Sequence, residues 1–375
     1  MNARSRYDVV IIGTGIAGAS LAHFLAERGV TDVLLLERED QPARHATGRS
    51  ASVLVELDTD PTLQGLKMLG GRFLREPPSG FAEHPLLDRR GVLLLFREPA
   101  WSAIRQVTPV IEQAGIRFEL LSVQEAIARA PVLSPTAFDG AAFLPDNGQI
   151  DVHQLLSSYL HHAKQHGVEQ RCDMEVRGIR VDGGRCAGVV TSAGEIRAQW
   201  VVNAAGAWAG AVGQLAGAAP IAFTPYRRTI ITFAAPEDLD VAKWPLVQSE
   251  VHQLYFRPEA DSVLLSPMDE TAMAPCDPPV DELIIAEALE RLAGLAPRLV
   301  PRSLRRKWAG LRTFSPDRVP VVGEDPLRAG FFWLAGQGGC GIETSPAMGQ
   351  IAADLIAFGK TDRFEVSALS PGRFG

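Results

Sequence analysis

Apolar residues occur in short runs between turn residues, and the first two runs flank a glycine-rich turn. Residues 9–12 form a β-branched run that predicts a buried parallel strand. Residues 33–36 form a second apolar strand, which ends at Glu37. Between the two runs, residues 13–18 have the spacing G-x-G-x-x-G at a strand-to-helix turn. This order of elements predicts a βαβ unit that binds a dinucleotide.

The three glycines of this turn have separate physical roles. Gly13 permits the tight turn, Gly15 lets the backbone approach a pyrophosphate, and Gly18 lets the helix pack closely on the strand. Ile16 and Ala17 begin the helix, whose unpaired N–H groups and dipole stabilise a pyrophosphate at its N-terminus.

The acid at the end of the second strand selects the kind of dinucleotide. Glu37 can accept hydrogen bonds from both hydroxyls of a ribose, and it would repel a 2′-phosphate, which argues against NADP. The alternative interpretation is an ordinary glycine-rich turn in another α/β protein. The complete strand, turn, helix and strand pattern favours the dinucleotide site.

Periodicity changes repeatedly beyond this unit, which predicts interleaved domains rather than two consecutive ones. Two ranges, 223–233 and 251–266, are rich in β-branched and aromatic residues broken by prolines at 225, 258 and 267, and they predict antiparallel strands. Other patterns predict a helix over 151–166, a β meander over 175–202 with a glycine turn at 182–184, an amphipathic helix over 281–295 and a final helix with its body over 345–358.

Composition restricts the possible partners. The chain has 375 residues, enough for two domains, and its net charge of −7 argues against nucleic acid or an anionic membrane as partner. Four scattered cysteines without C-x-x-C spacing predict reduced thiols in the cytoplasm and no metal site. Arg4 and Arg6 precede an apolar run that imitates a signal peptide, but the glycine turn explains that run. No other run is long enough to span a bilayer.

Four segments together resemble the D-amino-acid oxidase superfamily of FAD-dependent amine oxidoreductases. They are the glycine turn, VVNAAGAWA at 201–209, WAGLRTFSPDRVPVVGEDP at 308–326 and LAGQGGCGIETSPAMG at 334–349. Within the superfamily, EREDQPARHATGRSA, FAEHPLL, WAGLRTF and AGQGGCGIETSPAMG are most similar to bacterial D-arginine dehydrogenase, with glycine oxidase and sarcosine oxidase as more distant relatives.

The resemblance implies an α/β fold with a doubly wound, Rossmann-like FAD-binding domain. This domain would be interleaved with an α+β substrate domain whose antiparallel sheet covers the flavin. We expect residues 1–80, 145–220 and 310–375 in the FAD-binding domain, and residues 81–144 and 221–309 in the substrate domain.

The resemblance also implies a set of cofactor residues. The glycine turn would contact the pyrophosphate, and a terminal loop would present N–H groups to the pyrimidine side of the flavin, where reduction leaves negative charge. The remaining contacts would be Glu37 and Arg38 at the adenosine ribose; Thr47, Gly48, Arg49, Ser50 and Ala51 at the diphosphate and flavin edge; Val176 at adenine; Ala205, Gly206 and Trp208 in a small-residue turn; and Gly336, Gln337, Gly338, Gly339, Cys340 and Gly341 in the terminal loop.

FAD is expected to be held without a covalent bond. Cys340 lies in the terminal loop, but covalent cysteine attachment in the family occurs in a segment that coincides here with WAGLRTF and has no cysteine. His45 is the histidine candidate for a covalent link, and the non-covalent form is favoured over it.

The substrate residues follow from the reaction that the resemblance implies. Hydride transfer from an α-carbon to flavin N5 requires a fixed carboxylate and a neutral amine. Arg312 matches the family's carboxylate-binding arginine, and a guanidinium can bind a carboxylate bidentately. Arg228 and Tyr255 match two further carboxylate contacts, and Arg227 would replace Arg228 if the register slips by one.

The chain departs from D-arginine dehydrogenase where that enzyme holds a cationic side chain. The acid after EHPLL is absent, because the chain reads LLDRRGVLLLF there, and the expected lid contains Val53 and Leu54. An unpaired buried cation is costly, which favours an apolar substrate group. The alternative is that another acid, Glu83, Asp88 or Glu56, supplies this negative charge from a different position in the fold.

Three functions are therefore weighed. The first is oxidation of a D-amino acid with an apolar side chain, giving an imino acid that hydrolyses to an oxo acid. The second is glycine-oxidase-like cleavage of an N-substituted glycine to glyoxylate and a primary amine. The third is a non-enzymatic flavin-bearing subunit of a hetero-oligomer. The electron acceptor, oxygen or a quinone, is left open by the sequence.

Overall fold

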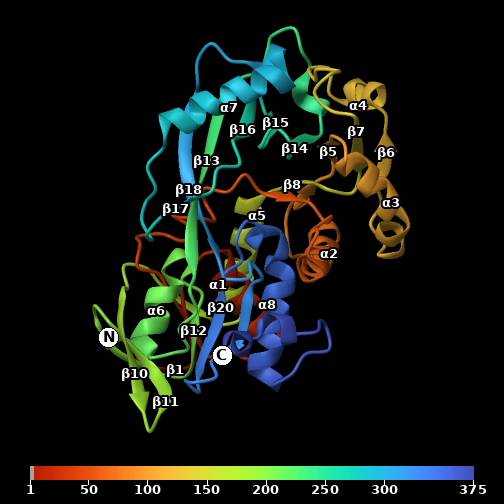
Figure 1. Ribbon diagram of the computed structural model, residues 1–375. Coiled ribbons are helices and arrows are strands. Elements are labelled where there is room, and N and C mark those ends of the chain that lie inside the picture. Colours follow the sequence, from red (N-terminus) through yellow and green to blue (C-terminus); the bar gives the residue numbers. More distant parts are fainter. Residues whose placement is uncertain (1–3) are drawn as a thin grey trace.

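Two large sheets organise the chain in a computed structural model that describes residues 4–375 (Figure 1). Residues 1–3 of the first predicted segment lie outside the described residues. The first sheet has the order β10-β11-β12-β1-β2-β9, with β20 on β12 and β19 on β20. Its strands are β1 (Arg6–Ile12), β2 (Val33–Leu36), β9 (Glu169–Arg171), β10 (Val176–Asp182), β11 (Arg185–Thr191), β12 (Gly194–Asn203), β19 (Val321–Glu324) and β20 (Phe331–Ala335).

The centre of the first sheet is parallel. β1 pairs in parallel with β2 and β12, and β12 pairs in parallel with β20. The strands β10, β11 and β12 form the predicted antiparallel meander. The surrounding helices are α1 (Ile16–Glu27), α2 (Pro61–Arg75), α5 (Val152–Gln165), α6 (Ala209–Ala216) and α8 (Gly341–Phe358).

The second sheet is mostly antiparallel and lies in the other half of the molecule (Figure 1). Its order is β17-β13-β16-β15-β14-β5-β7-β6, with β18 on β13. Its strands are β5 (Val92–Phe96), β6 (Glu119–Leu121), β7 (Gly140–Leu144), β13 (Thr224–Ala234), β14 (Leu246–Ser249), β15 (Leu254–Glu259), β16 (Ser262–Ser266), β17 (Thr271–Ala272) and β18 (Arg306–Phe314). The helices α3 (Ala100–Gln113), α4 (Val123–Arg129) and α7 (Glu282–Leu295) accompany it.

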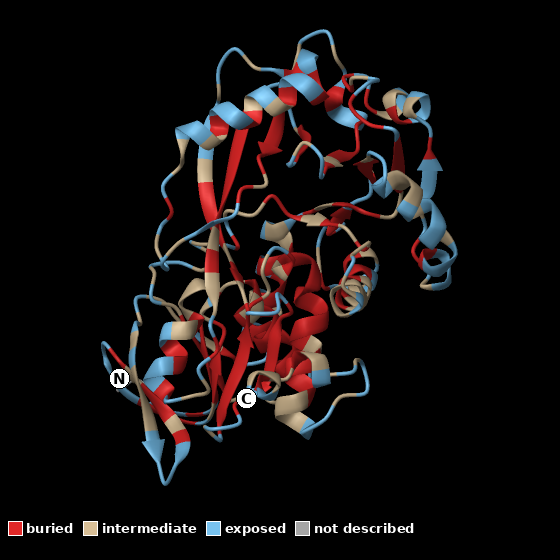
Figure 2. Cartoon of the chain, in the orientation of Figure 1, coloured by how far each residue is buried: buried red, intermediate tan, exposed pale blue. Residues whose placement is uncertain are grey.

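A small sheet connects the two halves. It has the order β3-β8-β4, with β3 at Val53–Leu54, β4 at Leu87–Asp88 and β8 at Gly148–Ile150. Short 3-10 turns complete the elements at Gly206–Trp208, Val241–Lys243, Pro297–Leu299, Ser367–Leu369 and Pro371–Phe374. Figure 2 shows buried residues along the central strands of both sheets and in the helices that cover the first sheet, whereas α3 is largely exposed.

The α/β fold and the interleaving of its segments are confirmed. Strands of the second sheet come from residues 92–144 and 224–314, between segments that build the first sheet. β18 passes the predicted boundary at residue 310, with Gly310–Phe314 still paired to β13. The domain boundaries themselves stay a prediction.

Two of the expected proline breaks lie inside strands. β13 continues through Pro225 and β15 continues through Pro258. Proline removes only a donor, and the carbonyl of Pro225 still accepts a hydrogen bond from the N–H of Met273 at 2.9 Å. The helix expected over 151–166 is confirmed as α5, in which the Asp151 carboxylate accepts from the N–H of Gln154.

Glycines let the helices approach other backbone closely. A Cβ on Gly18 of α1 would lie 2.0 Å from the carbonyl oxygen of Gly13, and a Cβ on Gly70 of α2 would lie 2.0 Å from that of Glu343 in α8. Both contacts are with backbone, which cannot move aside as a flexible side chain would. The packing of α2 on α8 therefore depends on the absence of a side chain at position 70.

We predict that Gly70→Ala destabilises the protein by about 1–3 kcal/mol, because the added methyl overpacks the helix contact. Gly294→Ala is the matched control, since Gly294 is also helical and a Cβ there would meet no atom within 4 Å. The free energy of unfolding of that control should rise by up to about 1 kcal/mol, because alanine has a higher helix propensity than glycine. The free energy of unfolding in urea measures both effects. Equal stability of the two variants would contradict the packing argument.

Candidate cofactor and substrate site

Three neighbouring cavities lead from the glycine turn to the second sheet. They have volumes of about 280, 150 and 1010 Å³. The first and second cavities share lining residues that include Gly15, Thr47 and Arg49. The second and third share Arg228, Tyr255 and Arg312, among others. The cavities therefore form one continuous elongated site.

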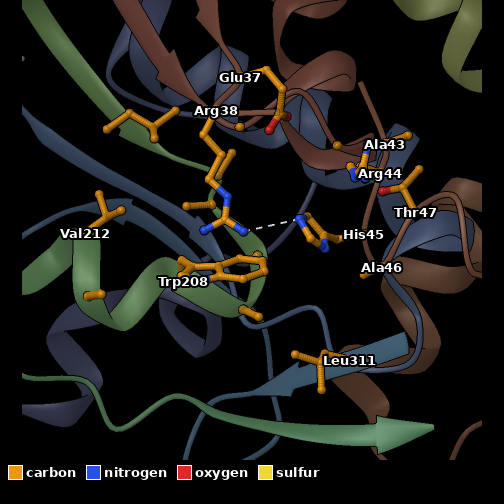
Figure 3. Close-up of a pocket in the computed structure, with 18 of the residues that line it drawn as sticks. Glu37, Arg38, Ala43, Arg44, His45, Ala46, Thr47, Trp208, Val212 and Leu311 are labelled. Atoms are coloured by element: carbon orange, nitrogen blue, oxygen red, sulfur yellow. Dashed lines mark hydrogen bonds between the residues drawn. The ribbon is translucent and has the colours of Figure 1, made fainter. Parts of the chain in front are cut away.

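The first cavity has an aromatic and cationic wall (Figure 3). The Arg38 guanidinium lies 3.7 Å from the centre of a Trp208 ring, which is a cation–π contact. Arg38 is also within hydrogen-bond distance of His45, whose Nε2 is 2.8 Å from a carboxylate oxygen of Glu39. The hydrogen bond with His45 holds the pKa of Glu39 below its usual value. Val176 lines the same cavity.

The Glu37 carboxylate is held by the glycine turn. Its Oε2 accepts hydrogen bonds from the N–H and hydroxyl of Thr14, at 3.1 and 2.7 Å, and its Oε1 accepts from the N–H of Glu39 at 3.2 Å. The acid therefore has a fixed orientation at the end of β2 and lines the first cavity.

The N-terminus of α1 faces the passage between the first and second cavities. The hydroxyl of Thr47 accepts a hydrogen bond from the N–H of Ile16 at 3.0 Å. A Cβ on Gly15 would lie 3.2 Å from that hydroxyl oxygen. Glycine at position 15 thus leaves the backbone of the helix start open to the site.

The second cavity lies between β18 and the loop before α8. Gly336 and Gly338 adopt positive φ angles of 72° and 55°, which glycine favours. A Cβ on Gly339 would lie 2.7 Å from Nη1 of Arg312, so this position permits the guanidinium to lie against the loop. Most residues of the loop line this cavity: Gly336, Gln337, Gly338, Gly339 and Gly341.

Cys340 is buried at the start of α8. Burial raises the pKa of its thiol to about 12, so the thiol stays protonated at neutral pH. Its Sγ donates to the carbonyl oxygen of Gln337 at 3.0 Å. A protonated, hydrogen-bonded thiol is a poor nucleophile.

Two guanidinium groups converge at the junction of the second and third cavities. In the pairing of β13 with β18, Arg228 lies opposite Gly310, and Arg312 lies opposite Tyr226, two positions farther along β18. The two arginines therefore lie diagonally on one face of the sheet.

Arg228 has donors that the protein leaves unused. Its Nη2 bonds Glu270 at 3.0 Å, but its buried Nε and Nη1 have no partner among residues 4–375. Burial and the nearby charge of Arg312 lower the pKa of Arg228 to about 10. Buried unpaired donors beside a second cation form a site for an anion, and a carboxylate matches the geometry of a guanidinium.

Comparison with known proteins places this geometry in a family. Residues 8–355 match the family model DAO, described as FAD dependent oxidoreductase. The chain belongs to this family. It is 28% identical to glycine oxidase from Geobacillus kaustophilus, over 94% of the chain and 93% of that protein. It is 27% identical to a hydrogen cyanide synthase subunit from Pseudomonas aeruginosa, over 98% of the chain and 96% of that protein.

Other relatives differ in length or share only the fold. Human mitochondrial sarcosine dehydrogenase is 25% identical over 96% of the chain, which spans only 40% of that protein. The crystal structure of the Geobacillus glycine oxidase has a TM-score of 0.83 at 26% identity, covering 98% of both chains. An L-proline dehydrogenase structure from P. horikoshii has a TM-score of 0.89 at 23% identity, covering 99% of this chain and 98% of that one.

The residues present fit the FAD of this DAO-family chain. The first two cavities combine a glycine turn, an acid at a strand end and two helix starts, the groups that bind a ribose and a pyrophosphate. The superfamily resemblance and the enzyme class are confirmed, whereas the finer resemblance to D-arginine dehydrogenase stays a prediction. Among residues 4–375, no helix is long and apolar enough to cross a membrane. The same residues contain no cluster of three or more His, Cys, Asp or Glu side chains that could hold a metal ion.

Most of the expected cofactor residues line these cavities. Gly18 and Gly48 are exceptions, since each is required by backbone packing, with a Cβ meeting the carbonyl oxygen of Gly13 or Ala43. Cys340 lines only the third cavity. The expected residues that line the first cavity, the second or both are Gly13, Gly15, Ile16, Ala17, Glu37, Arg38, Thr47, Arg49, Ser50, Ala51, Val176, Ala205, Gly206, Trp208, Gly336, Gln337, Gly338, Gly339 and Gly341.

Two expected substrate residues need correction. Arg227 lines none of the three cavities and instead pairs with Asp269 and Asp281 at 3.3 and 2.9 Å. Leu54 is fully buried in the core of the FAD half, whereas Val53 lines the third cavity. In both cases neighbouring residues of an extended chain point to opposite faces, so only one of each pair can reach the site.

The expected lid segment forms part of the wall of the third cavity through Val53, and whether it acts as a lid stays a prediction. Glu56 is buried and bonds Arg75 and the amide of Asn147 at 2.8 and 2.9 Å, so it cannot serve a substrate cation. Glu83 and Asp88 are exposed and line none of the three cavities.

Sequence reasoning missed Thr14, Glu270 and Glu343. Thr14 could have been found from the sequence, because it lies within the glycine turn and has a hydroxyl that can donate a hydrogen bond to the acid at the end of the next strand. Glu270, which binds both Arg228 and Arg318, stands in an irregular segment without a recognisable pattern. Glu343 belongs to the terminal segment that supports the resemblance, but its burial and partner are set by tertiary contacts.

We predict that Glu37→Ala weakens FAD binding, because a charge-assisted contact of about 1.5–3 kcal/mol is lost. This energy corresponds to roughly a tenfold to hundredfold rise in Kd. Glu195→Ala is the matched control, since Glu195 is an exposed acid on β12 of the same sheet and lines none of the three cavities. Flavin fluorescence during titration of apoprotein measures Kd. An unchanged Kd for Glu37→Ala would remove this acid from the cofactor site.

Proposed function

We propose that this chain oxidises the C–N bond of a carboxylate-bearing amine, preferentially a D-amino acid with an apolar side chain. A non-covalently held FAD would accept the hydride at N5, and water would then hydrolyse the imino acid to an oxo acid and ammonia. The observation that supports this most directly is the pair Arg228 and Arg312 at the junction of the flavin and substrate cavities, where Arg228 has two buried donors without a partner. A carboxylate supplies the missing acceptors.

The arginines would fix the substrate so that its α-carbon faces the cofactor. The Arg228 guanidinium is itself oriented by Glu270, which is in turn bound by both of its oxygens to Arg318 at 3.0 Å. Tyr255 lines the same junction, and its hydroxyl would be a further donor to the carboxylate. Fixing the carboxylate reduces the entropic cost of reaching the geometry for hydride transfer.

The walls of the third cavity favour an apolar group on the substrate. Side chains from the small sheet, the second sheet and α3 contribute, and among them are Val53, Val55, Leu94, Phe96, Ile104, Leu246 and Met268. An apolar wall stabilises each buried methylene by about 0.8 kcal/mol and leaves a guanidinium unpaired.

Cleavage of an N-substituted glycine is the second candidate function. The similarity to glycine oxidase favours it, as does a structure of iminodiacetate oxidase from Chelativorans sp. with a TM-score of 0.82 and 26% identity, covering 97% of this chain. The same arginine pair would hold the carboxylate, and the apolar group would then extend from nitrogen. A flavin-bearing subunit of a hetero-oligomer is disfavoured by the unpaired donors of Arg228. We also propose that the protein acts in the cytoplasm and that oxygen, a quinone or another acceptor reoxidises the flavin.

Arg312→Ala should leave FAD bound and reduce kcat/KM about tenfold to hundredfold, because a contact of about 1.5–3 kcal/mol is lost. Arg306→Ala is the matched control, since Arg306 is exposed at the beginning of the same strand. Anaerobic flavin bleaching measures the rate, and the flavin absorbance reports binding. Unchanged kcat/KM in Arg312→Ala would exclude this residue from the substrate site.

The order of substrates should follow apolar surface. We predict faster bleaching by D-leucine and D-methionine than by D-arginine, because Val53, Val55 and Leu94 give the substrate side chain an apolar wall. The acids Asp58, Glu270 and Glu343 also line this cavity, but each is already paired with Lys67 or an arginine, and Glu250 is exposed and bonds the Gln248 amide. An N-alkylglycine in the same competition separates the two candidate functions. Fastest bleaching by D-arginine would contradict the apolar site, and fastest bleaching by the N-alkylglycine would select the second candidate.

A further inference from the structure

A buried charge cluster forms the wall of the third cavity beside the cofactor loop. The ammonium of Lys67 lies 2.7 Å from Oδ2 of Asp58 and 3.5 Å from Oε1 of Glu343. The other oxygen of Glu343 accepts a hydrogen bond from the N–H of Val55 at 2.8 Å. Lys67 and Glu343 are only 9% and 6% exposed, and all three charged residues line the cavity.

The cluster joins three elements at one position. Lys67 is on α2, Asp58 follows β3, and Glu343 is in the first turn of α8. The loop that leads into this turn, Gly336–Gly341, lines the second cavity and forms the proposed flavin contact. Close packing at Gly70 fixes α2 against the backbone of Glu343. A carboxylate is therefore held rigidly next to the cofactor region.

Glu343 is the member of the cluster whose charge is adjustable. Burial raises the pKa of Glu343 to about 7, although the ammonium of Lys67 opposes this and Asp58 adds to it. For Lys67, burial opposes the charged form, but Glu343, Cys340 and Asp58 together raise its pKa above the ordinary value. Lys67 thus stays charged at neutral pH. Lys67, Asp58 and Cys340 are the titratable groups that face Glu343, and the thiol of Cys340 stays protonated.

We propose that Glu343 takes up one proton from solvent when the bound FAD is reduced, and that Lys67 sets the pH range in which this occurs. The inference rests on the proposed function, which places the flavin beside the first turn of α8. Hydride delivers two electrons and one proton and leaves one negative charge on the cofactor. That charge is repelled by an ionised Glu343 in a buried site, so protonation of its carboxylate, –COO⁻ plus H⁺ to –COOH, becomes favourable.

The test is the midpoint potential of the FAD-loaded protein as a function of pH, measured with dithionite and redox dyes and without any amine. The slope reports the number of protons taken up per two electrons. Below the pKa that Glu343 has in the oxidised, FAD-loaded protein, this acid is already protonated and contributes no proton. At higher pH we expect a range in which reduction takes up two protons per two electrons, one at the flavin and one at Glu343. This range ends where the pH exceeds the higher pKa that Glu343 has in the reduced protein.

Glu343→Gln should remove this range and give a slope of one proton per two electrons above neutral pH. Lys67→Met should move the range to higher pH, because loss of the ammonium strengthens proton binding by Glu343. Asp354→Asn is the matched control: Asp354 is a buried acid on the same helix, paired with Arg28 at 2.5 Å, and lines none of the three cavities. Its slope should equal that of the unmodified protein.

A slope of one proton throughout pH 6–9 in the unmodified protein, or an extra proton retained in Glu343→Gln, would overturn the inference. Flavin absorbance and thermal unfolding verify that each variant is folded and loaded. If Lys67→Met does not hold FAD, Glu343→Gln decides the question. Failure of the proposed function has a different signature, namely a protein that binds no FAD or shows no effect of Arg312→Ala on amine oxidation.

Discussion

The close approach of backbone to backbone at the end of β1 is the constraint on which the site depends. A Cβ on Gly13 would lie 2.5 Å from the carbonyl oxygen of Ala204, and one on Gly18 would lie 2.0 Å from that of Gly13 itself. These contacts fix α1 relative to β1 and β12, and they direct the N-terminus of α1 into the cavities. At the other end of the flavin region, the glycines before α8 open a second helix start in the same way. The backbone thus forms much of the lining of the cofactor site, and side chains at these glycine positions would fill the space that the cofactor needs.

Unbalanced positive charge distinguishes the substrate end of this site. Arg228 is buried with two unpaired nitrogens beside Arg312, an arrangement that costs stability in the absence of an anion. The pairing of β13 with β18 maintains this arrangement, because it places both arginines on one face. On the opposite face, Arg227 is neutralised by Asp269 and Asp281. The same dipeptide therefore supplies one structural ion pair and one binding group, and the second sheet determines which residue has which role.

The wall between these regions combines apolar surface with a buried ionic cluster. Val53, Val55 and Leu57 face the third cavity, while Leu54 and Glu56 face inward. Bonds from this segment to Asn147, Lys67 and Glu343 hold it in place. Such a wall provides a preorganised apolar surface for a substrate, and it also brings a titratable carboxylate close to the flavin region. Preorganisation limits the cost of fixing the substrate.

The sequence by itself determined the dinucleotide turn, the acid at its end, the family and the helices with clear caps, because these depend on residues close together in the chain. The glycine spacing 13–18, the cap at Asp151 and the loop 336–341 are local patterns. Tertiary structure alone decided which of Arg227 and Arg228, or Val53 and Leu54, faces the cavity, since strand pairing sets the direction of each side chain. It also decided the pairing of Lys67 with Glu343, because the two residues are brought together only by the packing of α2 on α8. Alternation along a strand is a local pattern, but strand pairing decides which of the two faces meets the cavity, and helix packing decides which distant residues touch.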